Sequence, residues 1–193
     1  ILPREKAEIP KADMGDPEAE KPIKSYNEEQ MEVSAPQFLI CAKVTPAPDG
    51  DTLLRQKIVA QLALRTVFGT SAAFYNRLYA DGTLNRDYDY EIDYTAGTAT
   101  IMLGGESASP QKVLDEINTE LESVFKNGID TAAFETAKRA SFGSRLRGLE
   151  DFDNLCLALA DGVFGGYCAL DAYEVLESIE KRECEDFLKA FMT

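Results

Sequence analysis

Hydrophobic residues recur along the chain with two different periods, which separate strands from helices. Residues 36–46 (PQFLICAKVTP) form a short apolar run with β-branched residues, closed by prolines, and this pattern predicts a buried strand. Residues 49–69 carry leucine, isoleucine and valine at helical spacing between Asp/Thr capping residues and Gly69, so they predict a helix. A second helix is predicted over 70–82, where Gly82 ends it.

Two strands are predicted next, over 86–95 and 98–105, with a hairpin turn at Ala96-Gly97 between them. The first of them alternates strictly between two kinds of residue. Its two faces carry Tyr88, Tyr90, Ile92 and Tyr94 on one side and Asp87, Asp89, Glu91 and Asp93 on the other. Because successive side chains of a strand point to opposite faces, this pattern predicts a half-buried strand with one wet, acidic face.

The remainder of the chain has helical patterns. The predicted helices cover 109–128, 129–149, 150–166, 171–179 and 180–192. Strands joined by a hairpin, with helices grouped after them, indicate an α+β fold in which helices pack on one face of an antiparallel sheet. A doubly wound parallel sheet would require regular alternation of strand and helix, which the pattern lacks.

Residues 1–34 differ from the rest in character. They hold four of the eight prolines and many charges, and they show neither helical nor strand period. The sequence therefore predicts a linker or strap over 1–34, followed by one α+β domain over 35–193.

Charge and length narrow the class of protein. The 193 residues, 45% of them hydrophobic, suffice for one substantial core. The net charge of −14 repels phosphate backbones and anionic lipid headgroups, so neither nucleic acid nor a membrane surface is expected as a partner. No apolar run reaches the roughly 20 residues that a membrane-spanning helix needs.

Histidine is absent, which removes the commonest metal ligand and general base and every Ser-His or Cys-His nucleophile pairing. The cysteines form no C-x-x-C pair. They are Cys41, Cys156, Cys168 and Cys184. Buried free thiols in a reducing, cytoplasmic environment are therefore predicted, rather than disulfides or a zinc site.

Other candidate chemistry is sparse. Carboxylates are plentiful, but no D-x-D-x-D-G loop is present, and no metal site is predicted. Ser141 and Ser144 lack a G-x-S-x-G elbow and a histidine partner, which excludes them as nucleophiles. Four arginines could either form positioning salt bridges, which the sequence favours, or clamp a substrate carboxylate or carbonyl. They are Arg77, Arg86, Arg145 and Arg147.

Several phrases in succession carry a family resemblance over residues 36–193. They are PQFLICAKV, FGTSAAFYNRLYADGTLN, the hairpin YDYEIDYTAGTATIMLGGES, and a pair of helices with G-I-D between them. This succession resembles the C-terminal, non-catalytic half of an insulinase/pitrilysin-type zinc metallopeptidase, in particular the bacterial processing-protease-like members. The resemblance implies a processing-peptidase-like metallopeptidase half-domain, which agrees with the α+β fold.

Family members have two similar halves around a chamber, and an inverted H-x-x-E-H motif in the first half holds zinc. The resemblance implies that this chain closes the chamber and helps to bind and orient a peptide substrate, with residues 1–34 as the end of the connector. Zinc and the general-base glutamate would come from the other half, which is the expected partner. The chain alone is expected neither to bind zinc nor to hydrolyse peptides.

Two residues acquire a role through the same resemblance. In catalytic relatives the second half presents an arginine and, seven residues later, a tyrosine, and both contact the bound peptide. Matching the end of the helix places Tyr79 and Arg86 at these positions, with the residue types exchanged. A phenol and a guanidinium supply hydrogen-bond donors in either order, so the resemblance implies that the two bind substrate.

Two alternatives stay open at this point. The parent protein could lack a zinc motif altogether and serve as the inactive subunit or scaffold of a two-chain peptidase. Alternatively, the chain could be a free-standing α+β binding domain with a flexible tail. An H-x-x-E-H motif upstream of Ile1 would favour the peptidase half over both.

Overall fold

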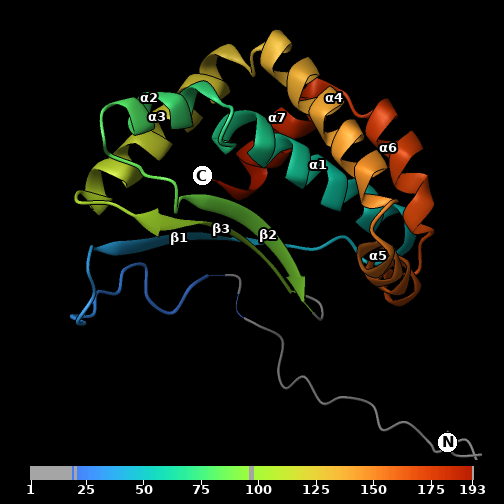
Figure 1. Cartoon of the computed structure of the whole chain (residues 1–193), viewed down its shortest axis with the longest axis horizontal. Coiled ribbons are helices and arrows are strands. Elements are labelled where there is room, and N and C mark those ends of the chain that lie inside the picture. The colour runs from blue at the N-terminus through green and yellow to red at the C-terminus, as the bar shows by residue number, and fades with distance from the viewer. Residues whose placement is uncertain (1–18, 20, 96–97, 193) are drawn as a thin grey trace, which may run out of the picture.

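A three-stranded antiparallel sheet forms one layer of the molecule, and helices cover one of its faces (Figure 1). The computed structural model describes residues 19, 21–95 and 98–192. The strands are β1 (Gln37–Val44), β2 (Asp89–Thr95) and β3 (Thr98–Glu106), in the spatial order β1-β3-β2. The α+β fold with helices on one face, predicted from the order of the elements, is confirmed.

The helices follow the predicted positions within a few residues. They are α1 (Gly50–Phe68), α2 (Ala73–Ala80), α3 (Pro110–Asn127), α4 (Thr131–Gly148), α5 (Phe152–Gly165), α6 (Ala172–Ser178) and α7 (Lys181–Phe191), with the short 3₁₀-helix η1 (Ala169–Asp171) between α5 and α6. Helix α1 lies at the centre of the helical layer, where it contacts β2, α4, α6 and α7. Asp130 caps α4, because its carboxylate accepts a hydrogen bond from the Ala133 N–H at 2.7 Å.

The sheet has one covered and one open face. On the covered face, Ile101 and Leu103 of β3 are buried, and Tyr88 donates a hydrogen bond from its hydroxyl to the Phe68 carbonyl at 3.0 Å. The predicted half-buried tyrosine face and exposed acidic face of β2 are confirmed. The prediction that β1 is a buried strand is wrong for one of its faces, because no helix among the described residues covers that face, and Leu39 is 64% exposed there.

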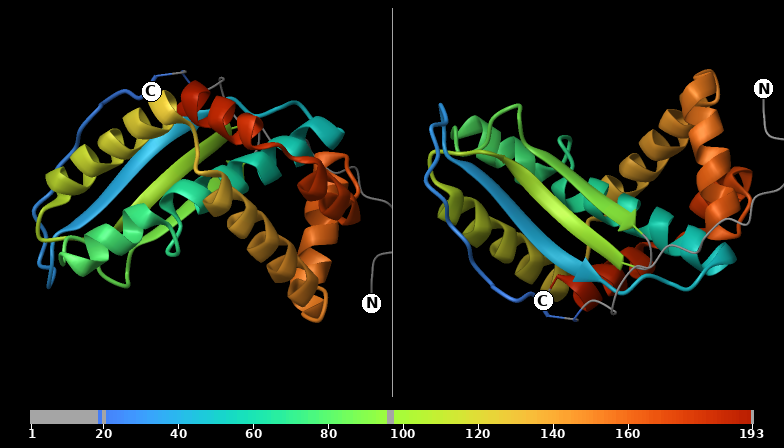
Figure 2. Two further views of the ribbon diagram at one scale, coloured as in Figure 1. Left: turned by 90° about the horizontal axis from the view of Figure 1, so that it is seen from above. Right: turned by 90° about the horizontal axis from the view of Figure 1, so that it is seen from below.

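Helices α4 and α5 diverge from the rest of the helical layer and form a projecting hairpin (Figure 2). Gly162 is the one buried residue of α5, and a side chain there would meet the Tyr167 carbonyl at 2.7 Å. An ionic contact ties α5 to α1, since Lys57 Nζ lies 2.8 Å from the Asp161 carboxylate. Burial opposes the shift, but hydrogen bonds from Lys57 and Tyr167 outweigh it and lower the pKa of Asp161.

In the described part of the chain, no single helix is long and apolar enough to cross a membrane. Helices α5 and α6, with η1 between them, meet the length and composition criteria only as a pair bent by 105°.

The predicted linker over 1–34 falls largely outside the described residues. The predicted hairpin turn at Ala96-Gly97 falls wholly outside them. Residues 21–34, which are described, form neither helix nor strand and are exposed. The division into a linker and a domain stays a prediction.

All four cysteines are free thiols, as predicted, but their predicted burial is wrong for three of them. Cys41 lies on the open face of the sheet and Cys156 on the projecting α5, and both are exposed. Cys168, in the turn after α5, is also exposed, whereas Cys184 is fully buried in α7.

We expect native protein at pH 8 to react with Ellman's reagent at three thiols, and at Cys184 only after unfolding. Burial, followed by the nearby charges of Glu183 and Glu185, raises the pKa of the Cys184 thiol from 9.0 to about 12. Because the unfolded thiol loses its proton first, this group should also lower stability as the pH rises above 9. Four equally fast thiols would contradict the docking of α7.

Candidate functional site

Tyr79 lies near the end of α2, at the outer end of a column of stacked tyrosine rings. Its ring centroid lies 5.5 Å from that of Tyr75, which in turn lies 5.6 Å from that of the buried Tyr88. The Tyr75 hydroxyl donates to the Asn85 carbonyl at 3.3 Å. The Tyr79 ring thus packs on Tyr75 on one side, and its side chain is 43% exposed to solvent.

Arg86 lies in the exposed loop between α2 and β2, and the structure brings it to Tyr79. The pKa of the Arg86 guanidinium is raised. The largest cause is a hydrogen bond with the Tyr79 phenol, and the next is the electrostatic interaction with the same group. The chain reverses direction at Gly82, whose φ of 76° is one that other residues rarely adopt. The two residues that the resemblance singled out are therefore neighbours, and we call them the Tyr79–Arg86 pair.

An anchored turn supports the Tyr79–Arg86 pair. The Asp81 carboxylate accepts a hydrogen bond from the Thr83 N–H at 2.9 Å and pairs with Lys112 Nζ at 2.8 Å. Hydrogen bonds from Lys112 and then Thr83 lower the pKa of Asp81 to about 2. The Asp81 carboxylate therefore stays ionised, and able to pair with Lys112, until the pH falls to about that value.

The other arginines differ in their partners. Arg77 bridges Glu116 and Glu120 of α3 at 3.1 and 3.3 Å, which is the positioning role that the sequence favours. Arg147 donates to the Ser144 hydroxyl at 3.2 Å. Arg145 has no carboxylate partner among the described residues, and it faces a hollow in the surface.

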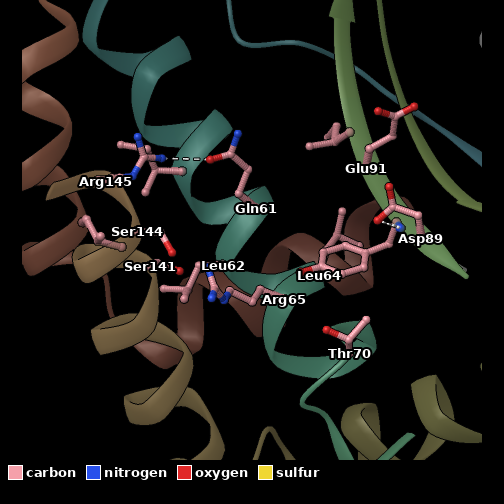
Figure 3. A pocket seen from close by; sticks show the side chains of 14 residues that line it. Gln61, Leu62, Leu64, Arg65, Thr70, Asp89, Glu91, Ser141, Ser144 and Arg145 are labelled. Atoms are coloured by element: carbon pink, nitrogen blue, oxygen red, sulfur yellow. Dashed lines mark hydrogen bonds between the residues drawn. The ribbon is translucent and has the colours of Figure 1, made fainter. Parts of the chain in front are cut away.

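This hollow, which we call the α4–β2 groove, has a volume of about 510 Å³ and lies between α1, α4 and β2. Figure 3 shows Arg145 on one side, Glu91 on the other, and Gln61 and Arg65 of α1 between them. A second hollow of about 370 Å³ shares Arg65 with the first and continues along the small residues of α4. The two hollows together follow the face of α4 that looks toward the sheet.

Two guanidinium groups mark the α4–β2 groove. Arg145 is half-buried and donates from Nη2 to the Gln61 side-chain oxygen at 2.8 Å, and burial lowers the pKa of its guanidinium. Arg65 is also half-buried, and its side chain forms no hydrogen bond or ion pair with any residue that the structure describes. The sequence analysis missed Arg65, although a lone cation within QLALRTVF was a signal for it.

The chain's own residues do not fit a zinc ion. The sequence contains no histidine, and within residues 21–95 and 98–192 no three side chains of the metal-binding types come together. Ser141 and Ser144 line the α4–β2 groove, and among the described residues no general base is hydrogen-bonded to either of them. The site is therefore suited to binding a ligand through hydrogen bonds and charge.

The fold is that of one half of an M16-like peptidase. A structure from Alicyclobacillus acidocaldarius, described as an M16-like peptidase, matches with a TM-score of 0.78 and 22% identity, covering 83% of this chain and 39% of that one. An inactive peptidase domain of a zinc protease from Bordetella parapertussis matches with a TM-score of 0.67 and 14% identity, covering 85% and 88%.

Sequence comparison leads to the same kind of protein. The chain is 23% identical over 173 residues to the uncharacterized zinc protease YmfH of Bacillus subtilis, which covers 89% of this chain and 40% of YmfH. No protein-family model matches the chain. The predicted resemblance to the C-terminal half of an insulinase-type zinc peptidase is confirmed, and the chain spans about 40% of the length of that relative.

Proposed function

We propose that this chain is the non-catalytic half of a zinc peptidase, which closes a chamber over a peptide and helps to orient it. The observation that carries the proposal is the fold of a zinc-protease half in a chain without a single histidine. Zinc and the residues that act with it would belong to the other half of a longer protein. The work of this half is then binding and positioning.

The Tyr79–Arg86 pair supplies the positioning groups in this proposal. Both side chains are exposed at the end of α2, and both carry hydrogen-bond donors. The stacked Tyr75 ring and the Asp81–Lys112 ion pair limit their movement, so little ordering is needed when a peptide binds. A peptide carbonyl placed between them would receive hydrogen bonds that fix its direction.

Helix α5 offers a surface for the other half. Four large apolar side chains on α5 are more than two-thirds exposed, and we call them the α5 apolar surface. They are Phe152 (76%), Leu157 (68%), Val163 (79%) and Phe164 (89%). Several large, exposed apolar side chains on one helix are typical of a protein interface. Since YmfH is more than twice as long as its matched segment, we propose that the remainder of such a protein covers this surface.

One observation favours a second candidate, an inactive subunit or scaffold of a two-chain peptidase. The matched Bordetella parapertussis structure is described as an inactive peptidase domain, and this chain covers 88% of it. A domain of this kind, similar in size to this chain, can thus be prepared by itself. In that case zinc would reside in a different polypeptide.

Zinc content and peptide hydrolysis of the natural full-length product, with this chain as the control, test the proposal. We expect about one zinc per longer chain and hydrolysis of unstructured peptides, and neither in the control. Zinc bound stoichiometrically by the control would refute the non-catalytic role. Absence of both activities from the longer product would favour the scaffold instead.

A further inference from the structure

The helical side of the α4–β2 groove is formed where one face of α1 meets one face of α4. Gln61 and Arg65 lie four residues apart on α1, and residues at this spacing share a face of a helix. Ser141 and Arg145 have the same spacing on α4. The hydrogen bond from Arg145 to Gln61, at 2.8 Å, fixes which turns of the two helices lie opposite each other.

Arg65 lies one turn beyond this hydrogen bond, opposite small side chains of α4. It lines both the groove and the second hollow, whose other lining residues include Ala137 and Ala140. Because these alanines precede Ser141 on α4, the two helices run in opposite directions here and Arg65 lies across from Ser141. Figure 3 shows the Ser141 and Ser144 side chains between the two arginines.

The donors around this space outnumber their acceptors. The half-buried Arg145 side chain has one acceptor, the α1 amide described above. Within the described ranges, neither the Arg65 guanidinium nor the Ser141 hydroxyl has a hydrogen-bond partner. The Ser144 hydroxyl accepts from Arg147 and keeps its own proton to donate. Since a guanidinium carries five N–H groups, most of the donors at this site are open, and two half-buried charges lack a counter-charge.

We propose that the α4–β2 groove binds a phosphoryl group between Arg65 and Arg145. The hydroxyls of Ser141 and Ser144 complete the set of donors. A phosphoryl group carries about −1.5 to −2 charges at neutral pH and three strong acceptor oxygens, which match two guanidinium groups that approach from different helices. The ligand is inorganic phosphate or a small phosphate monoester. This site is separate from the Tyr79–Arg86 pair and requires no zinc.

The frame that holds Arg145 is fixed before a ligand binds. The Tyr173 hydroxyl of α6 donates to the Arg145 carbonyl at 3.0 Å, and the Tyr173 ring lies 5.8 Å edge-on from that of Phe142 on α4. These contacts attach this part of α4 to α6, while the hydrogen bond to Gln61 attaches it to α1. Little ordering is therefore needed on binding, which favours affinity for a small ligand.

The sheet side of the groove limits the ligand to a compact one. Asp89 and Glu91 line that side, and Asp93 continues the same acidic face of β2. Together with the net charge of −14, this face would repel a long polyanion such as nucleic acid. A single phosphoryl group placed against the helices avoids most of this repulsion. The volume of about 510 Å³ leaves room beside it for the organic part of a monoester.

Isothermal titration calorimetry of this chain with inorganic phosphate and with glycerol 3-phosphate tests the site. Constant ionic strength, neutral pH and two temperatures prevent screening or a small enthalpy from being mistaken for the result. We expect one site per chain, and binding of acetate weaker by about tenfold or more, because acetate has one charge and two oxygens. Tighter binding of the monoester than of phosphate would support the site and assign its natural ligand to the esters. Absence of binding by both, or equal binding of acetate, would overturn the proposal.

Protein variants locate the phosphoryl group. We expect Arg65→Gln and Arg145→Gln each to weaken phosphate binding about tenfold or more, which is typical for loss of a charge-assisted hydrogen bond. The matched control is Arg139→Gln, which makes the same change at an exposed arginine of α4 and should leave the affinity unchanged. Circular dichroism verifies that each variant is folded. Unchanged affinity in a folded Arg65→Gln variant would overturn the proposal.

A carboxylate built into the groove should replace the ligand. We expect Ser141→Asp to place a negative charge across from Arg65 and to weaken phosphate binding by about tenfold or more. Ser123→Asp, the same change at an exposed serine of α3, should have no effect on binding. Equal affinities in the two variants would contradict the position of the site. A longer product that fails to hydrolyse peptides would refute the proposed function and leave these phosphate measurements unchanged.

Discussion

Replacing Phe74 with alanine should lower the free energy of unfolding by about 3–5 kcal/mol, the cost typical of a large-to-small change in a core. Phe74 is 1% exposed, and its ring lies 5.2 Å edge-on from that of Phe68 and 6.3 Å from that of Tyr88. The change would leave a cavity between α1, α2 and the sheet, because the remaining Phe68 and Tyr88 rings cannot close together to fill it. Urea unfolding followed by circular dichroism measures the effect, and it suits a chain without tryptophan.

The matched control is Phe164→Ala, the same change at a side chain that is 89% exposed on α5. Little contact is lost there, so we expect the free energy of unfolding to change by less than about 0.5 kcal/mol. The same variant should weaken association with the other half of the protein, because it removes part of the α5 apolar surface. A large loss of stability from Phe164→Ala would show that α5 is already packed within this chain.

The sequence predicted the elements well wherever one face of an element is buried and the other is wet. In α3, Val113, Ile117, Leu121 and Val124 recur at helical spacing, and all four are buried. The alternation of β2 likewise predicted which side of the strand faces the helices. In both cases one face of the element packs on the core and the other faces solvent. The hydrophobic pattern of a short sequence segment is enough to predict such an arrangement.

Features that depend on distant partners could not be predicted in this way. Helix α5 has the composition of a core helix, yet Phe164 is exposed, because no other part of the described chain reaches it. The pairing of β1 with β3, instead of with β2, also depends on contacts between remote segments. The sequence did not distinguish Arg145 from other surface arginines. The fold places Gln61 beside it, and no carboxylate of the described residues pairs with it.

The candidate site was predicted in part. Family resemblance named Tyr79 and Arg86, and the structure brings their side chains together, although their role in binding peptide stays a prediction. The α4–β2 groove was missed, because its lining comes from α1, β2 and α4, which are far apart in the sequence. The spacing of residues within one helix or strand does not predict which distant elements pack beside it.

Arg86→Ala in the longer, zinc-containing product should lower kcat/KM for peptide hydrolysis by about a hundredfold. Loss of one donor that stabilises developing charge on a carbonyl typically costs 10²–10³ in rate, and an exposed pair belongs at the lower end of this range. The fall should appear in kcat if the guanidinium acts in the transition state, and in KM alone if it only holds the ground state. Steady-state kinetics on one defined peptide separates the two cases.

Two further variants decide whether the pair, and not nearby charge, is responsible. Arg77→Ala removes a neighbouring arginine that is engaged with Glu116 and Glu120, so it should change kcat/KM by less than about threefold. Tyr79→Phe keeps the ring stacked on Tyr75 and removes only the hydroxyl, and we expect about a tenfold loss. Hydrolysis unaffected by both Arg86→Ala and Tyr79→Phe would exclude the pair from the substrate site.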